Sequence, residues 1–287
     1  MTAVANSVIS KILLFLLKLF GLIPRILNPL VSSSLLVLMR IFGRKEVRRI
    51  LGNLERVYGI PVHSVFSKTM AIQVLRHQSK AFLETLQQTV SDTVEIEGLE
   101  ELQVAMQDSL KLGKGVVVVT GHVGSWELVA HYGAKVAGGN FNALAKPARF
   151  NTLTQFLEDM RQSSKVKVLW NNRRSILRDM FQVLKSNEPL GFVMDQKPES
   201  RVGHMVSFLD QETMFVAGPA RIALKTRAPV LGIYCVRVGN LKYRLICDKI
   251  LYNSDTSEIE LTQLMAASIG RVVQSYPEQW LWNYRRW

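Results

Sequence analysis

Residues 116–127 read VVVVTGHVGSWE and decide the fold of this 287-residue chain. Four consecutive valines predict a strand buried on both faces, because β-branched residues favour extended backbone and no polar residue interrupts them. The glycines and serine that follow predict a turn, and a helix is expected from Glu127 onward. The stretch therefore places His122 and Glu127 at the carboxyl end of a buried strand, where open α/β sheets gather their reactive groups.

Short apolar runs alternate with longer helical stretches after Gly113. The runs VVVVT, FNALA, VKVLW and LGFVMD predict strands, and residues 127–136, 152–162, 174–185 and 218–226 predict helices between them. This alternation predicts the α/β class, with a largely parallel mixed sheet covered by helices on both faces. Residues 229–251 add two antiparallel strands turning at Gly239-Asn240, and residues 257–276 add a closing helix.

His122 and Glu127 have residue types suited to general acid–base catalysis. A histidine of near-neutral pKa can take a proton from a hydroxyl group, and a carboxylate on its second nitrogen fixes the tautomer. A regular helix would rotate Glu127 about 140° away from a residue five positions earlier. The pair can therefore meet only if Gly121 and Gly124 bend the backbone. The alternative is structural: Glu127 caps the helix and His122 is hydrogen-bonded in the core.

Several other chemistries lack their usual motifs. The chain contains no G-x-S-x-G, G-K-[ST], H-E-x-x-H or G-x-G-x-x-G pattern, which removes the common support for hydrolase, kinase, zinc-peptidase and dinucleotide-binding functions. Cys235 and Cys247 lie twelve residues apart in apolar runs, which predicts core thiols rather than a disulfide or zinc site. No metal and no other cofactor is expected.

The N-terminal region is apolar and basic. Two apolar arms lie between Ile12 and Phe42, separated by Pro24 and Pro29, and each is shorter than the ~20 residues of a spanning helix. They fit one kinked span, a shallow hairpin, an interfacial helix or a helix packed on the body. Residues 1–57 contain nine Lys or Arg and two Glu, over half of the net charge of +13. This charge predicts binding to anionic membrane lipids, with the body on the cytoplasmic face.

Nucleic acid is the rival partner for a basic chain, but no RNP, zinc-finger or homeodomain pattern is present, and nucleic-acid binding is not expected.

The hydropathy and charge patterns divide the chain into three parts. Residues 1–43 are expected to form an apolar membrane anchor, and residues 44–90 two amphipathic linking helices broken at Gly59-Ile60-Pro61. Residues 91–287 are expected to form the α/β domain.

The site motif has a specific resemblance. Residues 121–127, GHVGSWE, resemble the His-x4-Asp/Glu signature of the lysophospholipid acyltransferase superfamily, in the Gly-His-x-Gly-x-Trp-Glu form of its lipid A biosynthesis acyltransferase branch. Further matches follow in order: Arg48 to Asn53-Leu54, Lys146-Pro147, Asn151, Asp195-Gln196-Lys197-Pro198, Val206-Ser207-Phe208, Gly218-Pro219-Ala220, Ala223, Ala228-Pro229-Val230 and the ending PEQWLWNYRRW. The matches run over nearly the whole chain from about Lys45.

The resemblance implies a membrane-attached O-acyltransferase of the bacterial inner membrane. It would move a fatty acyl group from an acyl carrier protein thioester, or a coenzyme A thioester, to a hydroxyl of a membrane glycolipid such as a lipid A precursor. His122 would be the general base and Glu127 its carboxylate partner. Asp195 is a second candidate partner, because it follows another strand and some relatives pair their histidine with a later acidic residue.

The resemblance also suggests substrate-binding residues. Gln196 is expected to position the substrate or support the structure. Lys146 and Arg149 follow a strand, where a cation could meet a lipid phosphate or a developing oxyanion. Arg161 resembles a recurrent arginine of the family.

Departures from the family pattern leave the acceptor open. Residues 148–151 read ARFN where Asp-Asn-Pro is common, residues 207–210 read SFLD in place of Phe-Phe-Gly, and Tyr284 stands where His is frequent. Another phospholipid, a mannosylated inositol lipid or an aminolipid is therefore an alternative acceptor. A lipid-binding scaffold without catalysis and a thioesterase that uses water are alternative functions.

Overall fold

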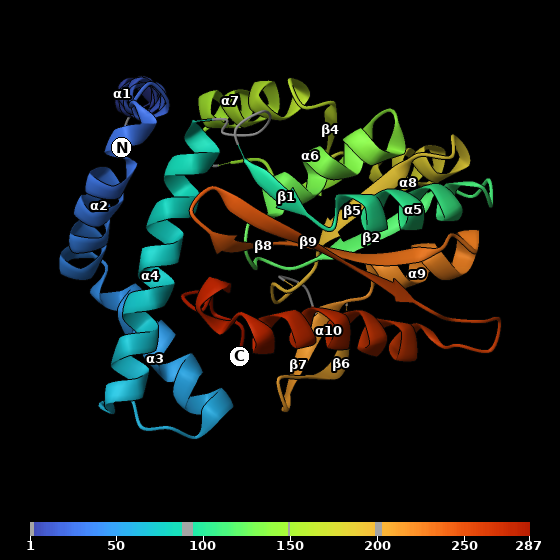
Figure 1. Ribbon diagram of the computed structural model, residues 1–287. Helices are drawn as coiled ribbons and strands as arrows, with labels where there is room; N and C mark the ends of the chain where they lie inside the picture. Colours follow the sequence, from blue (N-terminus) through green and yellow to red (C-terminus); the bar gives the residue numbers. More distant parts are fainter. Residues whose placement is uncertain (1–2, 88–93, 149, 199–202) are drawn as a thin grey trace.

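The computed structural model describes residues 3–87, 94–148, 150–198 and 203–287, and within them seven strands form one sheet (Figure 1). Its strands are β1 (Glu95–Glu97), β2 (Val116–Thr120), β3 (Phe141–Ala145), β4 (Val166–Trp170), β5 (Pro189–Val193), β8 (Val230–Gly239) and β9 (Lys242–Ile250). The strand order is β1-β9-β8-β2-β5-β3-β4. All neighbours run parallel except β8 and β9, which pair antiparallel as expected.

Helices cover both faces of this sheet. Val116 and Val118 pack into a core with α5 (Leu99–Leu110) and α6 (Trp126–Ala137). Val117 and Val119 pack into the opposite core with α8 (Ile176–Lys185), α9 (Gly218–Thr226) and α10 (Glu258–Ser275). The alternation of side chains along β2 thus divides the four buried valines between two cores. The predicted class, a largely parallel mixed sheet with helices on both faces, is confirmed.

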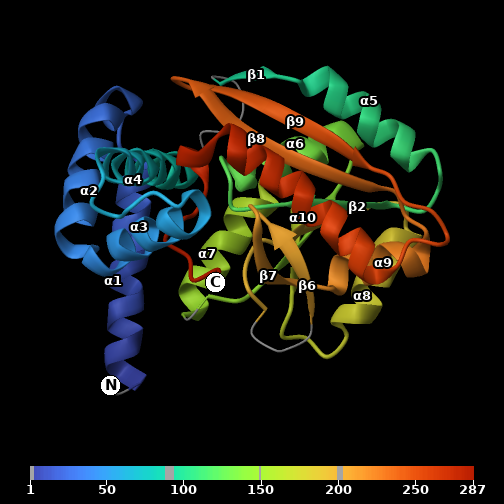
Figure 2. The ribbon, with the colours of Figure 1, turned by 90° about the horizontal axis from the view of Figure 1, so that it is seen from below.

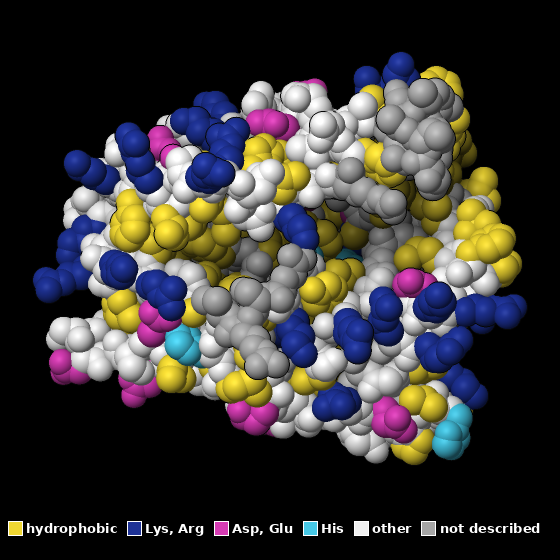
Figure 3. All heavy atoms as spheres, turned by 180° about the vertical axis from the view of Figure 1, so that it is seen from behind, with side chains coloured by type: hydrophobic (Ala, Val, Ile, Leu, Met, Phe, Trp, Pro, Cys, Tyr) yellow, Lys and Arg dark blue, Asp and Glu magenta, His cyan; other side chains and the backbone are white. Residues whose placement is uncertain are grey.

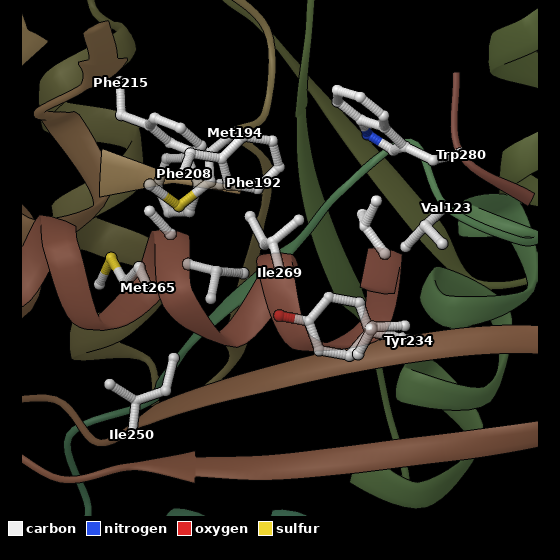
Figure 4. Packing of buried hydrophobic residues seen from close by; sticks show 14 of the residues in the cluster. Val123, Phe192, Met194, Phe208, Phe215, Tyr234, Ile250, Met265, Ile269 and Trp280 are labelled. Atoms are coloured by element: carbon white, nitrogen blue, oxygen red, sulfur yellow. The ribbon is translucent and has the colours of Figure 1, made fainter. Parts of the chain in front are cut away.

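The second core extends to a small hairpin that the strand pattern did not predict. Strands β6 (Gly203–Phe208) and β7 (Gln211–Val216) pair antiparallel outside the main sheet and pack against α10. Figure 4 shows Phe208 and Phe215 from this hairpin beside Met265 and Ile269 of α10.

Helix α4 (Val65–Leu86) stands between the N-terminal helices and the sheet (Figures 1 and 2). Helix α1 (Ala3–Gly21) packs against α4 and α7 (Asn151–Gln162), and α2 (Asn28–Phe42) packs along α4. A 3-10 turn, η1 (Arg25–Leu27), separates α1 from α2 after Pro24. Helix α3 (Arg44–Tyr58) ends at Gly59, which adopts the left-handed conformation.

The apolar arms are both helical. Among the described residues, the stretch Arg25–Phe42 is long and apolar enough to cross a membrane by length and composition. Helix α2 packs one side on α4, and its other side leaves Leu30, Val37, Ile41 and Phe42 exposed. The surface that these arms present is therefore strongly apolar although both helices contact the protein.

A buried ion pair joins α4 to the sheet. Arg237 of β8 and Tyr243 of β9 both donate hydrogen bonds to the Glu84 carboxylate. The side chains of Arg237 and Glu84 are only 12% and 14% exposed. Removal of one partner from such a pair leaves the other charge buried without compensation.

We expect Glu84→Ala to lower the free energy of unfolding by about 3–5 kcal/mol, because the Arg237 guanidinium would stay buried without its carboxylate. Urea denaturation followed by circular dichroism measures the change. Glu55→Ala removes an exposed carboxylate from α3 and serves as the matched control, with an expected change within about 0.5 kcal/mol. Equal stability of the two variants would contradict the structural role of the ion pair.

Candidate active site

The turn that carries His122 depends on two glycines. Gly124 has a φ of 64°, and a Cβ atom there would lie 2.0 Å from the carbonyl oxygen of Cys235. A Cβ on Gly121 would lie 2.8 Å from Ile269 Cγ2 and 3.1 Å from Asp195 Oδ2. Any side chain at either position would collide with its surroundings. The two glycines therefore let the turn pack directly against β8 and against Asp195.

His122 and Asp195 form a hydrogen-bonded pair. The Nδ1 atom of His122 lies 2.6 Å from Asp195 Oδ1, and the His122 backbone N–H donates to Asp195 Oδ2 at 2.7 Å. Asp195 comes two residues after β5, which pairs with β2 in register so that Thr120 lies opposite Val193. Both chains therefore leave the sheet at the same carboxyl edge, and this adjacency brings the two residues together.

The hydrogen bonds of Asp195 define the tautomer of His122. An ionised carboxylate only accepts hydrogen bonds, so Nδ1 of His122 carries the proton that points at Asp195. The Nε2 atom is then an unprotonated acceptor, and the Gln196 side-chain amide lies 3.3 Å from it. His122 is thus held in the form that can take a proton at Nε2.

The charges around His122 oppose the effect of its burial. Burial alone would lower the pKa of His122, but the charge of Asp195, the hydrogen bond to it and the charge of Glu127 together raise this pKa above its ordinary value. Burial alone would raise the pKa of Asp195, but the charge of protonated His122 and the hydrogen bonds from His122 and Trp280 lower it. The pair therefore favours a carboxylate next to a basic imidazole.

Glu127 contacts a different partner. Arg161 of α7 donates from Nε to Glu127 Oε2 at 3.0 Å and from Nη2 to Oε1 at 2.7 Å. The two side chains are 17% and 20% exposed. The carboxylate that hydrogen-bonds His122 is therefore that of Asp195, whereas Glu127, which the motif favoured, forms a bidentate ion pair and acts on His122 only through its charge.

Both pairs open into one groove of about 750 Å³. His122, Trp126, Glu127 and Arg161 line one part of it. The remaining wall is largely apolar. Gln279, Trp280 and Leu281 form a small part of it. Most of its apolar residues come from α1, α2, α4 and α7, namely Leu17, Leu35, Met39, Phe82, Leu86, Leu153, Phe156 and Leu157. A groove of this shape and lining suits a fatty chain whose reactive end lies at His122.

Two further residues expected at the site are not part of this arrangement as the structure describes it. Lys146 is exposed beyond the end of β3 and is not among the residues that line the groove. Arg149 lies outside the described residues. Within the described part of the chain, no group of three or more His, Cys, Asp or Glu is arranged to hold a metal ion.

Two groove residues were not identified from the sequence. Trp280 donates its indole N–H to Asp195 Oδ2 at 2.8 Å. The motif PEQWLWNYRRW contained it, but nothing in the local pattern indicated a contact with a residue 85 positions earlier. His77 of α4 lines the same groove, and burial together with the charge of Arg237 lowers its pKa to about 4. An isolated histidine in a helix gave no signal of this placement.

The sheet, the His122–Asp195 pair and the apolar groove are compatible with an acyltransferase. The chain belongs to the bacterial lipid A biosynthesis acyltransferase family, whose model matches residues 4–287. The resemblance found in the sequence motifs is thereby confirmed. Among characterised proteins, the chain is similar to the phosphatidylinositol mannoside acyltransferase of Mycolicibacterium smegmatis, with 24% identity over 254 residues that cover 85% of this chain and 80% of the relative. The enzyme of that name from Mycobacterium tuberculosis is 26% identical over 257 residues, covering 85% and 77%.

We expect the pKa of His122 to lie above about 6.5, the ordinary value for histidine, because the charge of Asp195, the hydrogen bond to it and the charge of Glu127 together outweigh burial. In Asp195→Asn that charge is lost while the burial remains, so the pKa should fall. NMR titration of the imidazole resonances measures both values. If His122 is the general base, the rise of kcat/KM with pH should move to lower pH in Asp195→Asn as well. A histidine pKa below 6.5 in the wild-type protein would contradict this electrostatic balance.

Proposed function

We propose that the protein transfers a fatty acyl group from a thioester to a hydroxyl of a membrane glycolipid. The observation that carries this proposal is the His122–Asp195 pair, whose histidine lines a largely apolar groove of about 750 Å³. Membership in the acyltransferase family supports it independently.

In the proposed reaction, His122 Nε2 takes the proton of the acceptor hydroxyl while the hydroxyl oxygen attacks the thioester carbonyl. The new C–O bond gives a tetrahedral intermediate with an oxyanion. When the intermediate collapses, the C–S bond breaks and the departing sulfur takes the proton from the His122 imidazolium. Asp195 stabilises the imidazolium between these two proton transfers, and no covalent intermediate with the protein is needed.

Arg161, Gln196 and Glu127 have supporting roles in this proposal. The Arg161 guanidinium is the cation held in the groove beside the site, where it can stabilise the oxyanion or bind a phosphate. Glu127 fixes Arg161 by two hydrogen bonds. Gln196, whose amide already lies at His122 Nε2, is placed to orient the acceptor hydroxyl. Lys146 and Arg149 remain proposed contacts for lipid phosphates.

The comparisons support two candidate acceptors. The family description favours a lipid A precursor as the acceptor, and the names of the mycobacterial relatives favour a phosphatidylinositol mannoside as the alternative. Both are glycolipids with sugar hydroxyls. We propose acyl carrier protein as the thioester donor, with coenzyme A as the alternative.

The same proposal places the protein on the cytoplasmic face of the bacterial inner membrane, with residues 1–43 as the anchor. Exposed Leu30, Val37 and Phe42 of α2 support apolar contact with the bilayer. Helix α3 follows directly and exposes Arg44, Lys45, Arg48, Arg49 and Arg56. Figure 3 shows a face hollowed near its centre, with hydrophobic side chains and Lys and Arg side chains around the hollow. Apolar insertion beside a cationic helix suits an anionic membrane surface.

His122→Ala should lower acyl transfer by about 10²–10⁴-fold, the usual contribution of a general base. We would incubate the purified full-length protein with acyl carrier protein and coenzyme A thioesters and total bacterial lipid extract, and follow the lipids by mass spectrometry. The lipid that gains one acyl residue identifies the acceptor. His63→Ala, which removes an exposed histidine, is the control and should keep full activity.

Asp195→Ala and Glu127→Gln distinguish the two carboxylates in the same assay. Of these two carboxylates, Asp195 hydrogen-bonds His122 and Glu127 hydrogen-bonds Arg161, so the loss of Asp195 should lower kcat more than the loss of charge at Glu127. Release of free thiol without acylated lipid would indicate a thioesterase. Lipid binding with neither product would favour a scaffold and refute the proposed function.

Arg48→Ala combined with Arg49→Ala should weaken binding to anionic vesicles by roughly 30-fold, since each basic residue near the surface contributes about 1 kcal/mol. Sedimentation with vesicles containing phosphatidylglycerol measures this effect, and neutral vesicles should show little change. Arg178→Ala with Lys185→Ala removes two exposed cations from α8, far from α1 and α2 (Figure 1), and is the matched control. Equal loss in both double variants would contradict the assigned membrane face.

A further inference from the structure

We propose that Gln279, Trp280 and Leu281 form a terminal strap that fixes the geometry of the site, with Trp280 as a positioning residue for the Asp195 carboxylate. This inference rests on the proposed function of the His122–Asp195 pair and adds to it a group that acts through Asp195. The strap comes from the last nine residues of the chain.

The backbone of the strap pairs with the turn that carries His122. The Gly124 N–H donates to the Gln279 carbonyl at 3.0 Å, and the Leu281 N–H donates to the His122 carbonyl at 3.0 Å. Between these two bonds, Val123 and Trp280 form an antiparallel bridge. The strap thus adds a short strand to the turn directly at the proposed base.

The other side of the turn is held by β8. The Ser125 N–H donates to the Cys235 carbonyl at 2.7 Å, and Gly124 and Cys235 form a parallel bridge. The His122 turn therefore lies between β8 and the strap, and hydrogen bonds on both sides fix its backbone. The turn alone does not determine where the His122 ring points, because Asp195 must also be fixed.

Trp280 supplies that second constraint. Its indole N–H donates to Asp195 Oδ2 at 2.8 Å, and the same oxygen accepts the His122 backbone N–H at 2.7 Å. With Oδ2 held by two donors, Oδ1 is directed at His122 Nδ1, 2.6 Å away. Both hydrogen bonds to Oδ2 depend on the strap. The Trp280 side chain donates the first, and the second comes from the His122 turn, whose backbone is hydrogen-bonded to the strap.

The Trp280 ring has little freedom to move. It is 2% exposed and packs edge-on against Phe208 and Trp282, with ring centroids 5.6 and 4.7 Å away. Figure 4 shows the ring at the end of the buried cluster, beside Val123. Since the ring is fixed by packing, its N–H is a preorganised donor, which costs no reordering when the charge on His122 changes.

The strap itself is tied to the sheet. The Gln279 side-chain amide accepts from the Arg237 N–H at 2.9 Å and donates to the Arg237 carbonyl at 2.8 Å. Further along, Arg286 is fully buried over the Phe215 ring and donates to the Met214 carbonyl at 2.8 Å. The segment is thus fixed to β8 before Trp280 and to β7 after it.

Trp280→Phe keeps an aromatic ring and removes the N–H donor. We expect kcat to fall by about 10–100-fold, since misplacement of catalytic groups has large effects, while KM stays within about 3-fold because most apolar wall residues of the groove lie on other elements. Trp170→Phe is the matched control. It makes the same change at another buried tryptophan, on β4, which is not among the rings that pack on Trp280 and does not donate to Asp195, so kcat should stay within about 3-fold of wild type.

A double-variant cycle tests whether Trp280 acts through Asp195. In an Asp195→Ala background, Trp280→Phe should lower kcat by less than about 3-fold, because the carboxylate that it positions is gone. An equal fold-loss in both backgrounds, or equal loss in Trp280→Phe and Trp170→Phe, would overturn the proposal. If Trp280→Phe does not fold, site-specific incorporation of benzothienylalanine keeps the ring shape without the N–H, and unchanged kcat there would overturn it as well.

A spectroscopic measurement separates this inference from the proposed function. The proton in the short His122 Nδ1–Asp195 hydrogen bond should give a low-field NMR resonance in the wild-type protein. We expect it to shift or disappear in Trp280→Phe and to remain in Trp170→Phe. If the wild-type protein transfers no acyl group, the proposed function fails, and an unmoved resonance in Trp280→Phe would overturn the positioning role independently.

Discussion

The burial of one carboxylate constrains the whole site. Asp195 is 2% exposed, and an ionised carboxylate in such a place must be compensated by hydrogen bonds or an opposite charge. Its donors come from the turn after β2, which supplies the His122 ring and backbone, and from Trp280 near the end of the chain. Three segments that are distant in sequence must therefore be placed correctly before any of them can stabilise this charge.

The sheet topology makes that arrangement available. Strands β2 and β5 are neighbours in parallel register, so Gly121 and Met194 leave the sheet side by side. A glycine at 121 is needed because a Cβ atom would lie 3.1 Å from Asp195 Oδ2 and 2.8 Å from a side chain of α10. The helix α10 that closes this face of the sheet also leads into the segment that carries Trp280. The elements that form the core therefore also position the residues of the site.

The local sequence predicted the secondary structure and the strand ends, but not the contacts between distant segments. Valine-rich runs and helical spacing predicted the parallel strands, the helices after them and the antiparallel pair β8–β9, because side-chain periodicity reports burial directly. His122 and Asp195 were both placed at strand ends. The choice of Asp195 over Glu127 as the hydrogen-bond partner depends on β5 lying next to β2, which is a non-local property of strand order. Trp280 was missed for the same reason, since only tertiary structure brings residue 280 to residue 195.

The groove holds two charge systems with separate tasks in the proposed reaction. Glu127 already accepts two hydrogen bonds from Arg161, so its orientation is set by that cation rather than by His122. Asp195 is fixed by donors on both oxygens and can orient the imidazole. Proton transfer to His122 would create a positive charge beside Asp195, and the charge of Glu127 would also stabilise it. The reacting oxygen would become negative within the groove that Arg161 lines. Apolar walls strengthen each of these interactions, because they keep water from screening them. In the proposed reaction, the groove would therefore contribute to catalysis as well as to binding.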